Sequence, residues 1–179
     1  MNPHLRVTLI QADLAWQDPS ANRSLFASHF RGLVGHTDLI VLPEMFTTGF
    51  SMDAAALAET MDGPTVEWMR EEAVSLGCAI TGSVIIRDGD RHCNRLLWVT
   101  ADGQLQHYDK RHLFRMAKEQ EHYAAGESRL VVRLKGWRIC PLVCYDLRFP
   151  VWSRNRGDYD LLLYVANWPQ RRAHAWSTL

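Results

Sequence analysis

The sequence predicts an α/β fold with a mixed sheet, and three observations support this prediction. Apolar runs of strand length alternate with helix-like segments along the chain. Residue pairs that end in glycine and favour tight turns separate several of the runs, as at Asp88-Gly89. No linker or low-complexity stretch interrupts the 179 residues, a length that normally corresponds to one domain with a sizeable core. We therefore expect a single domain over residues 1–179.

The first half of the chain alternates strands with two helices. An apolar run predicts the first strand at 5–12, and Asp18-Pro19 then supplies the N-cap and first-turn residues of a helix. A second apolar run predicts a short buried strand at 39–42, which Pro43 stops. A second helix is expected over 63–77, because it opens with Gly-Pro, carries apolar residues at helical spacing and ends in glycine.

Hairpins dominate the second half. The expected strands, in order, are 78–86, 91–100, 104–108, 130–134, 137–143 and 160–165. The glycine-containing turns that join them are Asp88-Gly89, Asp102-Gly103 and Lys135-Gly136. Pro150 suits the first turn of a helix after the strand at 137–143. This combination of hairpins and crossovers favours a mixed sheet.

Composition argues against several classes of partner. The chain carries 20 basic and 20 acidic residues, so no overall field favours nucleic acid or an anionic membrane. The longest apolar run, 161–166, is far shorter than the ~20 residues of a membrane-spanning helix. The N-terminus has no apolar signal region and the four cysteines form no CxxC pair, so we expect reduced thiols in the cytoplasm. The eight histidines show no metal-type spacing.

The most informative segment is LVCYDLRFP at 142–150, which places Cys144 where a buried strand turns into a helix. Such a turn lifts a side chain out of the sheet edge and points free backbone N–H groups at a ligand. A thiol there can act as a nucleophile, and the N–H of Tyr145 can stabilise an oxyanion. The alternative is a small core cysteine, because free cysteines are often buried.

Two further polar residues follow predicted strands. Glu44 comes directly after the strand that Pro43 stops, and Lys110 follows the strand at 104–108. Open α/β sheets place their ligands at the carboxyl ends of strands. A carboxylate partly removed from water there has a raised pKa and can serve as a base near neutral pH. Taken singly, Glu44 is better interpreted as a solvated loop residue, and Lys110 as an ordinary surface lysine.

Together, these segments make the chain resemble the nitrilase superfamily of carbon–nitrogen hydrolases. The motifs are LPEMF at 42–46, YDKRHLF at 108–114 and LVCYDLRFP at 142–150. A narrower similarity to bacterial omega-amidases is carried by MFTTGF at 45–50, KRHLFRMAKE at 110–119 and YVANWP at 164–169. The resemblance implies a four-layer α-β-β-α sandwich, usually a homodimer, without metal or other cofactor. It also implies hydrolysis by water of the terminal amide of a small 2-oxo acid, of the 2-oxoglutaramate type.

The family's roles transfer to matching positions. Glu44 matches the general base, Lys110 the oxyanion-stabilising lysine and Cys144 the nucleophile. Many members have a second glutamate beyond the lysine. Here the spacing favours Glu119, with Glu121 as the alternate. We also expect the Lys110 ammonium to lower the pKa of the Cys144 thiol below the ~8.5 of free cysteine.

Substrate contacts are proposed on weaker grounds. Arg148, four residues after Cys144, is the candidate partner for the distant carboxylate of an oxo acid. Its alternative role is structural, paired with Asp146 or with the helix. Four aromatic residues are candidates for the pocket wall, although each could instead belong to the core: Phe46, Phe50, Phe114 and Trp168.

Other functions stay open. A related hydrolase could act on a nitrile, a carbamoyl group or a different amide with the same catalytic residues. A papain-type Cys-His enzyme would need a histidine beside Cys144, and the chain has no CGSCW signature. Family members continue beyond the position of Leu179, so we expect part of the second sheet and of the dimer surface to be missing. An inactive fragment or scaffold protein is therefore a third alternative.

Overall fold

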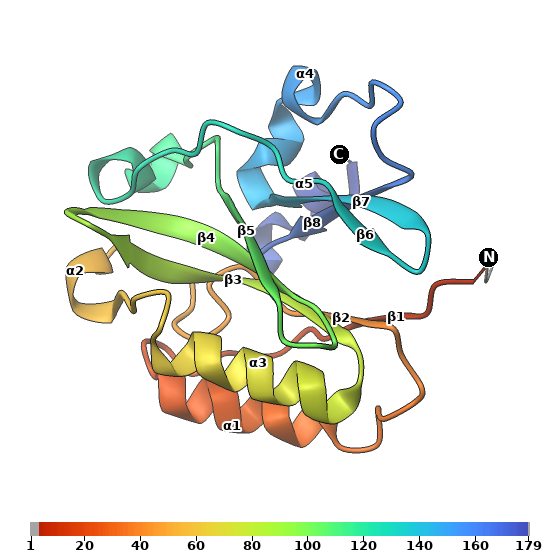
Figure 1. The fold of residues 1–179 in the computed structure, drawn as a ribbon. Coiled ribbons are helices and arrows are strands. Elements are labelled where there is room, and N and C mark those ends of the chain that lie inside the picture. The colour runs from red at the N-terminus through yellow and green to blue at the C-terminus, as the bar shows by residue number, and fades with distance from the viewer. Residues whose placement is uncertain (1–3, 179) are drawn as a thin grey trace.

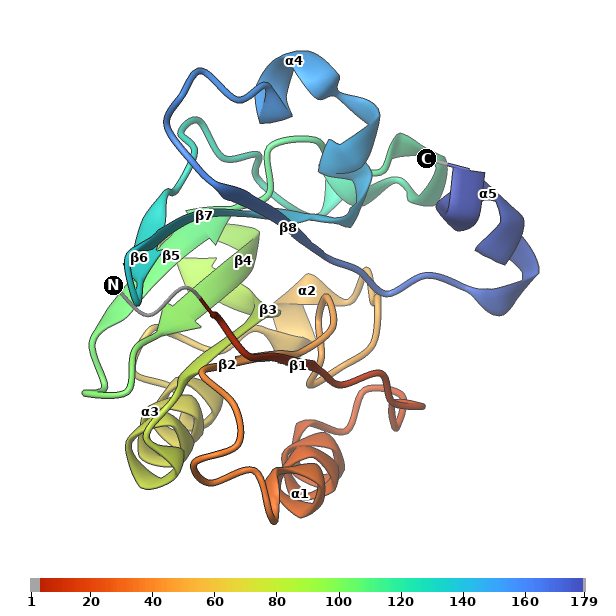
Figure 2. The same cartoon turned by 90° about the vertical axis from the view of Figure 1, so that its right-hand side faces the viewer.

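The computed structural model describes residues 4–178 and contains two sheets that lie face to face (Figures 1 and 2). The larger sheet has the order β1-β2-β3-β4-β5 and the smaller one β6-β7-β8. Strands β1–β2, β2–β3 and β7–β8 pair in parallel, and the other neighbours are antiparallel. The strands are β1 Val7–Leu9, β2 Leu39–Val41, β3 Ala79–Asp88, β4 Arg91–Val99, β5 Leu105–Asp109, β6 Val132–Leu134, β7 Trp137–Val143 and β8 Leu161–Val165. The expected α/β fold with mixed sheets is confirmed.

Helices flank the sheets and connect them. The α-helices are α1 Pro19–Phe30, α2 Ala54–Leu57, α3 Pro64–Leu76, α4 Pro150–Ser153 and α5 Ala173–Thr178. Short 3₁₀ segments are η1 Arg115–Ala117, η2 Glu119–Glu121, η3 Cys144–Arg148 and η4 Gln170–Arg172. Among the described residues, none of these helices is long and apolar enough to cross a membrane.

Two apolar layers hold this arrangement together. Helices α1 and α3 lie side by side on the outer face of the large sheet (Figures 1 and 2), with Phe26 and Met69 buried beneath them. Between the sheets, Trp98 from β4 and Leu142 from β7 belong to a second buried cluster. The outer face of the small sheet carries the one-turn helix α4. These layers agree with the expected sandwich.

Local sequence signals explain where α1 begins and where α3 ends. The Asp18 carboxylate accepts the backbone N–H of Ala21 at 2.9 Å, as an N-cap residue does, and Pro19 follows it. Helix α3 ends at Gly77, which has φ +66° and donates its N–H to the carbonyls of Ala73 and Val74. Glycine adopts this left-handed conformation without the penalty that other residues incur.

Several elements are shorter than expected, among them β6, which covers three residues of the expected 130–134. Strand β1 covers three residues of the expected 5–12, because it is an edge strand and Leu9 is 70% exposed. The helix expected at Pro150 is one turn long and separate from η3. Phe149 stands between them with φ −121° and ψ 73°, since a residue before proline is disfavoured in the helical region.

Candidate active site

Cys144 occupies a strained turn at the carboxyl end of β7. Its backbone has φ +40°, a left-handed conformation that residues other than glycine rarely adopt. Strain of this kind persists only where the surroundings enforce it. Here the Asp146 carboxylate accepts the N–H of Val143 at 3.1 Å, so it fixes the turn from the other side. The turn leaves the Cys144 side chain 8% exposed at the floor of a pocket.

A second strained turn carries Glu44 at the end of β2. Met45 has φ +46°, and its N–H donates to the Ser83 hydroxyl at 2.9 Å. The chain lies against β3 so closely that a Cβ at Gly82 would come within 2.8 Å of Leu42 Cβ. Glycine at 82 is therefore required for this approach. As a result Glu44 points inward and is fully buried.

Lys110 follows β5, and its backbone is held on both sides. Its N–H donates to the carbonyl of Asn94 at 3.0 Å, while its own carbonyl accepts the N–H of Gly126 at 3.0 Å. A Cβ at Gly126 would lie 2.1 Å from the Asp109 carbonyl oxygen, so only glycine fits this contact. These bonds direct the Lys110 side chain into the interior, where it is 1% exposed.

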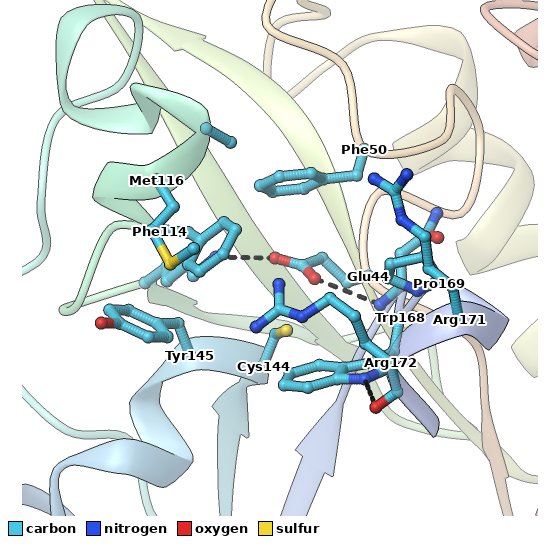
Figure 3. A pocket seen from close by; sticks show the side chains of 13 residues that line it. Glu44, Phe50, Phe114, Met116, Cys144, Tyr145, Trp168, Pro169, Arg171 and Arg172 are labelled. Atoms are coloured by element: carbon cyan, nitrogen blue, oxygen red, sulfur yellow. Dashed lines mark hydrogen bonds and ion pairs between the residues drawn. The ribbon is translucent and has the colours of Figure 1, made fainter. Parts of the chain in front are cut away.

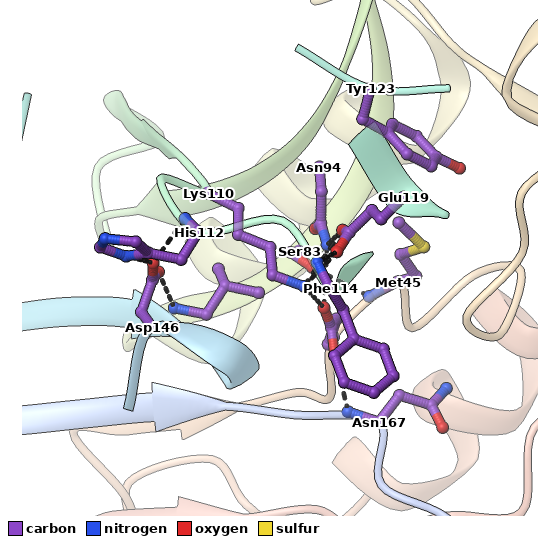
Figure 4. A network of polar contacts seen from close by, with 12 residues as sticks. Met45, Ser83, Asn94, Lys110, His112, Phe114, Glu119, Tyr123, Asp146 and Asn167 are labelled. Atoms are coloured by element: carbon purple, nitrogen blue, oxygen red, sulfur yellow. Dashed lines mark hydrogen bonds and ion pairs between the residues drawn. The ribbon is translucent and has the colours of Figure 1, made fainter. Parts of the chain in front are cut away.

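The carboxylates of Glu44 and Glu119 meet at the Lys110 ammonium, and Figure 4 shows Lys110 reaching toward Glu119. Lys110 Nζ lies 2.8 Å from Glu44 Oε1 and 2.9 Å from Glu119 Oε2. Asn94 Nδ2 bridges the same two carboxylates, at 2.9 Å from Glu44 Oε1 and 3.2 Å from Glu119 Oε1. The other oxygen of Glu44 accepts the N–H of Asn167 at 3.1 Å. The backbone N–H of Phe114 donates to Glu119 Oε2. Each carboxylate oxygen of Glu44 and Glu119 therefore accepts at least one hydrogen bond.

Burial and charge act in opposite directions on this network. Burial alone lowers the pKa of Lys110, but the two neighbouring carboxylates outweigh it and the net pKa is raised. The ammonium therefore stays charged at neutral pH. Burial raises the pKa of Glu119, and the nearby Glu44 adds to that rise against the pull of Lys110. The network thus holds one fixed positive charge between two carboxyl groups.

The prediction that Lys110 lowers the pKa of the Cys144 thiol is wrong. Burial raises the pKa of this thiol, the negative charge of Glu44 raises it further, and Lys110 only partly offsets them. Hydrogen bonding to Glu44 also favours the protonated thiol. The expectation considered Lys110 alone, whereas the site brings two carboxylates to one ammonium. In the resting site the thiol is therefore neutral.

Asp146 connects the Cys144 turn to the loop after Lys110. Its carboxylate accepts the Tyr108 hydroxyl at 2.7 Å and the backbone N–H of His112 at 2.9 Å, and contacts His112 Nδ1 at 2.8 Å. The His112 ring stacks on Phe149 with centroids 3.7 Å apart. These contacts join the carboxyl ends of β5 and β7, the strands that Lys110 and Cys144 directly follow. The Asp146 carboxylate is fully buried and already accepts these hydrogen bonds, so it does not pair with Arg148.

A pocket of about 370 Å³ opens above Cys144 (Figure 3). Its wall includes Glu44, Lys110 and Tyr145 together with the predicted aromatic residues Phe50, Phe114 and Trp168. Tyr145 stands at the N-terminal end of η3, where backbone N–H groups lack helical partners.

The structure does not bring Phe46, Arg148 or Glu121 to this pocket. Phe46 is buried in the outer core, with its ring centroid 5.5 Å from that of Phe26, because the turn at Met45 directs it there. Arg148 is exposed. Its four-residue spacing from Cys144 would place both on one face of an α-helix, but η3 is a 3₁₀ helix with three residues per turn. Glu121 is 53% exposed and faces Lys118.

Sequence reasoning missed three residues of the site. Asn94 lies inside β4 between Cys93 and Arg95, where the sequence gives no signal of a site, and it is fully buried. Asn167 donates its backbone N–H, which no sequence pattern reveals. Arg172 lines the pocket because η4 turns back after Trp168. In residues 4–178, no group of three His, Cys, Asp or Glu residues is placed to hold a metal ion.

Comparison with known proteins gives consistent matches. The Carbon-nitrogen hydrolase family model matches residues 6–179. Omega-amidase YafV of Escherichia coli (strain K12) is 52% identical over 177 residues, which cover 99% of this chain and 68% of that protein. The 2-oxoglutaramate amidase of Bacillus subtilis (strain 168) is 30% identical, with 97% and 69% covered.

A solved structure extends the match to three dimensions. XC1258 from Xanthomonas campestris is described as a CN-hydrolase superfamily protein with an arsenic adduct in the active site. It superposes with a TM-score of 0.94 at 55% identity, over 97% of this chain and 69% of that one. With its family match over nearly the whole chain and its fold, this protein belongs to the carbon–nitrogen hydrolase family.

Proposed function

We propose that this protein hydrolyses the terminal amide of a small omega-amido 2-oxo acid, of the 2-oxoglutaramate type, to a carboxylate and ammonia. The observation that carries the proposal is the Lys110 ammonium held between Glu44 and Glu119 in the wall of a pocket that ends at Cys144. Relatives named omega-amidase and 2-oxoglutaramate amidase support the choice of substrate.

In the first half of the reaction, Cys144 attacks the amide carbon. Glu44 accepts the thiol proton as the S–C bond forms, and the oxygen of the tetrahedral intermediate is stabilised by Lys110 and the Tyr145 N–H. Glu44 then gives its proton to the departing nitrogen. The C–N bond breaks, ammonia leaves and a thioester remains on Cys144.

Water completes the cycle. Glu44 takes a proton from the water as its oxygen attacks the thioester carbon, and the same donors hold the second oxyanion. The S–C bond breaks, and the sulfur recovers its proton from Glu44. The sum is amide plus water giving carboxylic acid plus ammonia. Glu119 acts as a positioning residue, because its bonds to Lys110 and Asn94 fix the groups that face the substrate.

The test is ammonia release from a panel of amides, nitriles and carbamoyl compounds that includes 2-oxoglutaramate. Cys144→Ala should abolish release, and wild type quenched during turnover should carry an acyl mass on the peptide that contains Cys144. Cys93→Ala is the matched control, because Cys93 is a buried free thiol outside the pocket. An acyl adduct on another residue would end the proposal. Preference for a nitrile would favour the related hydrolase instead.

Three broader expectations belong to the same proposal: a single domain, a cytoplasmic location and a homodimer. The four cysteines are free thiols, which suits a reducing compartment. Light scattering during size-exclusion chromatography distinguishes a dimer from a monomer.

A further inference from the structure

Arg172 is held in the pocket by aromatic rings. Its guanidinium carbon lies 5.1 Å from the centroid of the Phe114 ring and 4.9 Å from that of Trp168. The Trp168 indole N–H donates to the Arg172 carbonyl at 2.8 Å, so the ring and the backbone of η4 are joined. Figure 3 shows the side chain reaching into the pocket above Cys144. Contacts with aromatic faces orient a guanidinium while leaving its N–H donors free.

No carboxylate in the described part of the chain forms an ion pair with the Arg172 guanidinium. Among residues 4–178, Arg172 has no ion pair and no side-chain hydrogen bond, whereas five other arginines have carboxylate partners: Arg6, Arg23, Arg95, Arg129 and Arg138.

 The carboxylate in the pocket wall belongs to Glu44. It already accepts hydrogen bonds from Lys110, Asn94 and the Asn167 N–H.

The shape of the pocket restricts what can supply the missing charge. At about 370 Å³ it admits a small molecule, and its apolar wall is formed by rings such as Phe50 and Phe114. The polar groups of the pocket are the Cys144 thiol with Lys110 and Glu44, and the Arg172 guanidinium above Cys144. A short chain that carries an amide and an anion can pair with both sets of groups. A neutral amide leaves the guanidinium without an acceptor.

We infer that Arg172 binds the carboxylate of the substrate and makes the pocket selective for amides that carry a negative charge. The inference rests on the proposed amidase function and adds the residue that recognises the acid. Because the guanidinium offers paired donors in one plane, it suits a carboxylate in a two-point contact. Arg171 also lines the pocket and adds a second positive charge to the same wall.

The test compares two amides of similar length, succinamate, which carries a carboxylate, and butanamide, which does not. Charged hydrogen bonds in a partly buried site contribute about 1.5–3 kcal/mol, so Arg172→Ala should raise KM for succinamate by about 10- to 100-fold. The KM for butanamide and kcat for both amides should change by less than about 3-fold. Arg172→Lys should recover part of the loss, because it restores charge without the planar fork. Arg31→Ala, at the exposed end of α1, is the matched control.

The outcomes separate this inference from the proposed function. Wild type that hydrolyses both amides with equal kcat/KM would overturn the role of Arg172 while leaving amide hydrolysis in place. An equal loss toward both amides in Arg172→Ala would also overturn it, because the residue would then act on the fold of the pocket. Absence of ammonia release from every amide tested would instead reject the proposed function.

Discussion

Lys110→Met removes the only ammonium from a site with two buried carboxylates, so it should destabilise the protein strongly. In the wild type Lys110 Nζ lies within 3 Å of both Glu44 and Glu119, and all three side chains are fully buried. Removing one partner of a buried ion pair costs about 3–5 kcal/mol. At roughly 2–4 °C per kcal/mol for a domain of this size, the melting temperature should fall by roughly 6–20 °C.

The loss should depend on pH in a defined direction. Burial already raises the pKa of Glu119 above its usual value of 4.5, and loss of the ammonium raises it further. A group whose pKa is higher in the folded than in the unfolded state stabilises the fold below its unfolded pKa, and that contribution is lost as pH rises through the folded pKa. The gap between Lys110→Met and wild type should therefore be smallest below about pH 4.5 and widen toward neutral pH.

Denaturant unfolding at several pH values measures this gap directly. Lys110→Met/Glu119→Gln, which removes one carboxylate as well, should recover at least half of the loss at pH 7 but no turnover. Lys118→Met is the matched control, because that lysine is 72% exposed and its ion pair with Glu121 should contribute less than about 1 kcal/mol. A Lys110→Met variant within about 1 kcal/mol of wild type at neutral pH would refute the electrostatic reasoning.

Three other outcomes are expected. Glu44→Gln should keep the melting temperature within a few degrees yet reduce ammonia release by at least about 10²-fold, since the variant has no base; normal turnover would contradict the proposed role. Alkylation of Cys144 by iodoacetamide should be slow at pH 7 and still rise above pH 9, because burial and Glu44 raise the thiol pKa; a plateau below pH 7 would reject this. Asp146→Asn should lower kcat by about 10-fold with little change in KM, because the turn and the Lys110 loop lose their common acceptor; an unchanged kcat would argue against positioning.

The strands and their ends were predictable because apolar runs and glycine turns are local signals. Once 39–42, 104–108 and 137–143 are strands, the residues after them lie at strand ends, and the structure brings Glu44, Lys110 and Cys144 together there. The exact lengths were less predictable, since the edge strand β1 depends on pairing with β2 rather than on its own sequence.

The finer parts of the site depend on backbone conformations that residue types do not specify. The left-handed turn at Met45 sends Phe46 into the core, and the 3₁₀ geometry of η3 separates Arg148 from Cys144. Asn94 became recognisable only when β4 paired with β5 and placed its amide between the two carboxylates. Arg172 depends on the turn η4, which brings a residue far from the motifs to the pocket.

The neutral thiol has a consequence for how the reaction begins. With two carboxyl groups against one ammonium, a thiolate at Cys144 would add a further negative charge to a buried site, and its raised pKa reflects that cost. In the proposed mechanism, attack on the amide therefore coincides with proton transfer to Glu44, because the negative charge then forms on the carbonyl oxygen and not on the sulfur. In this arrangement the thiol stays protonated until a bound substrate provides a carbonyl oxygen that can take the negative charge. In the proposed mechanism Lys110 therefore stabilises the negative oxygen rather than a resting thiolate, which agrees with an ammonium already held by two carboxylates.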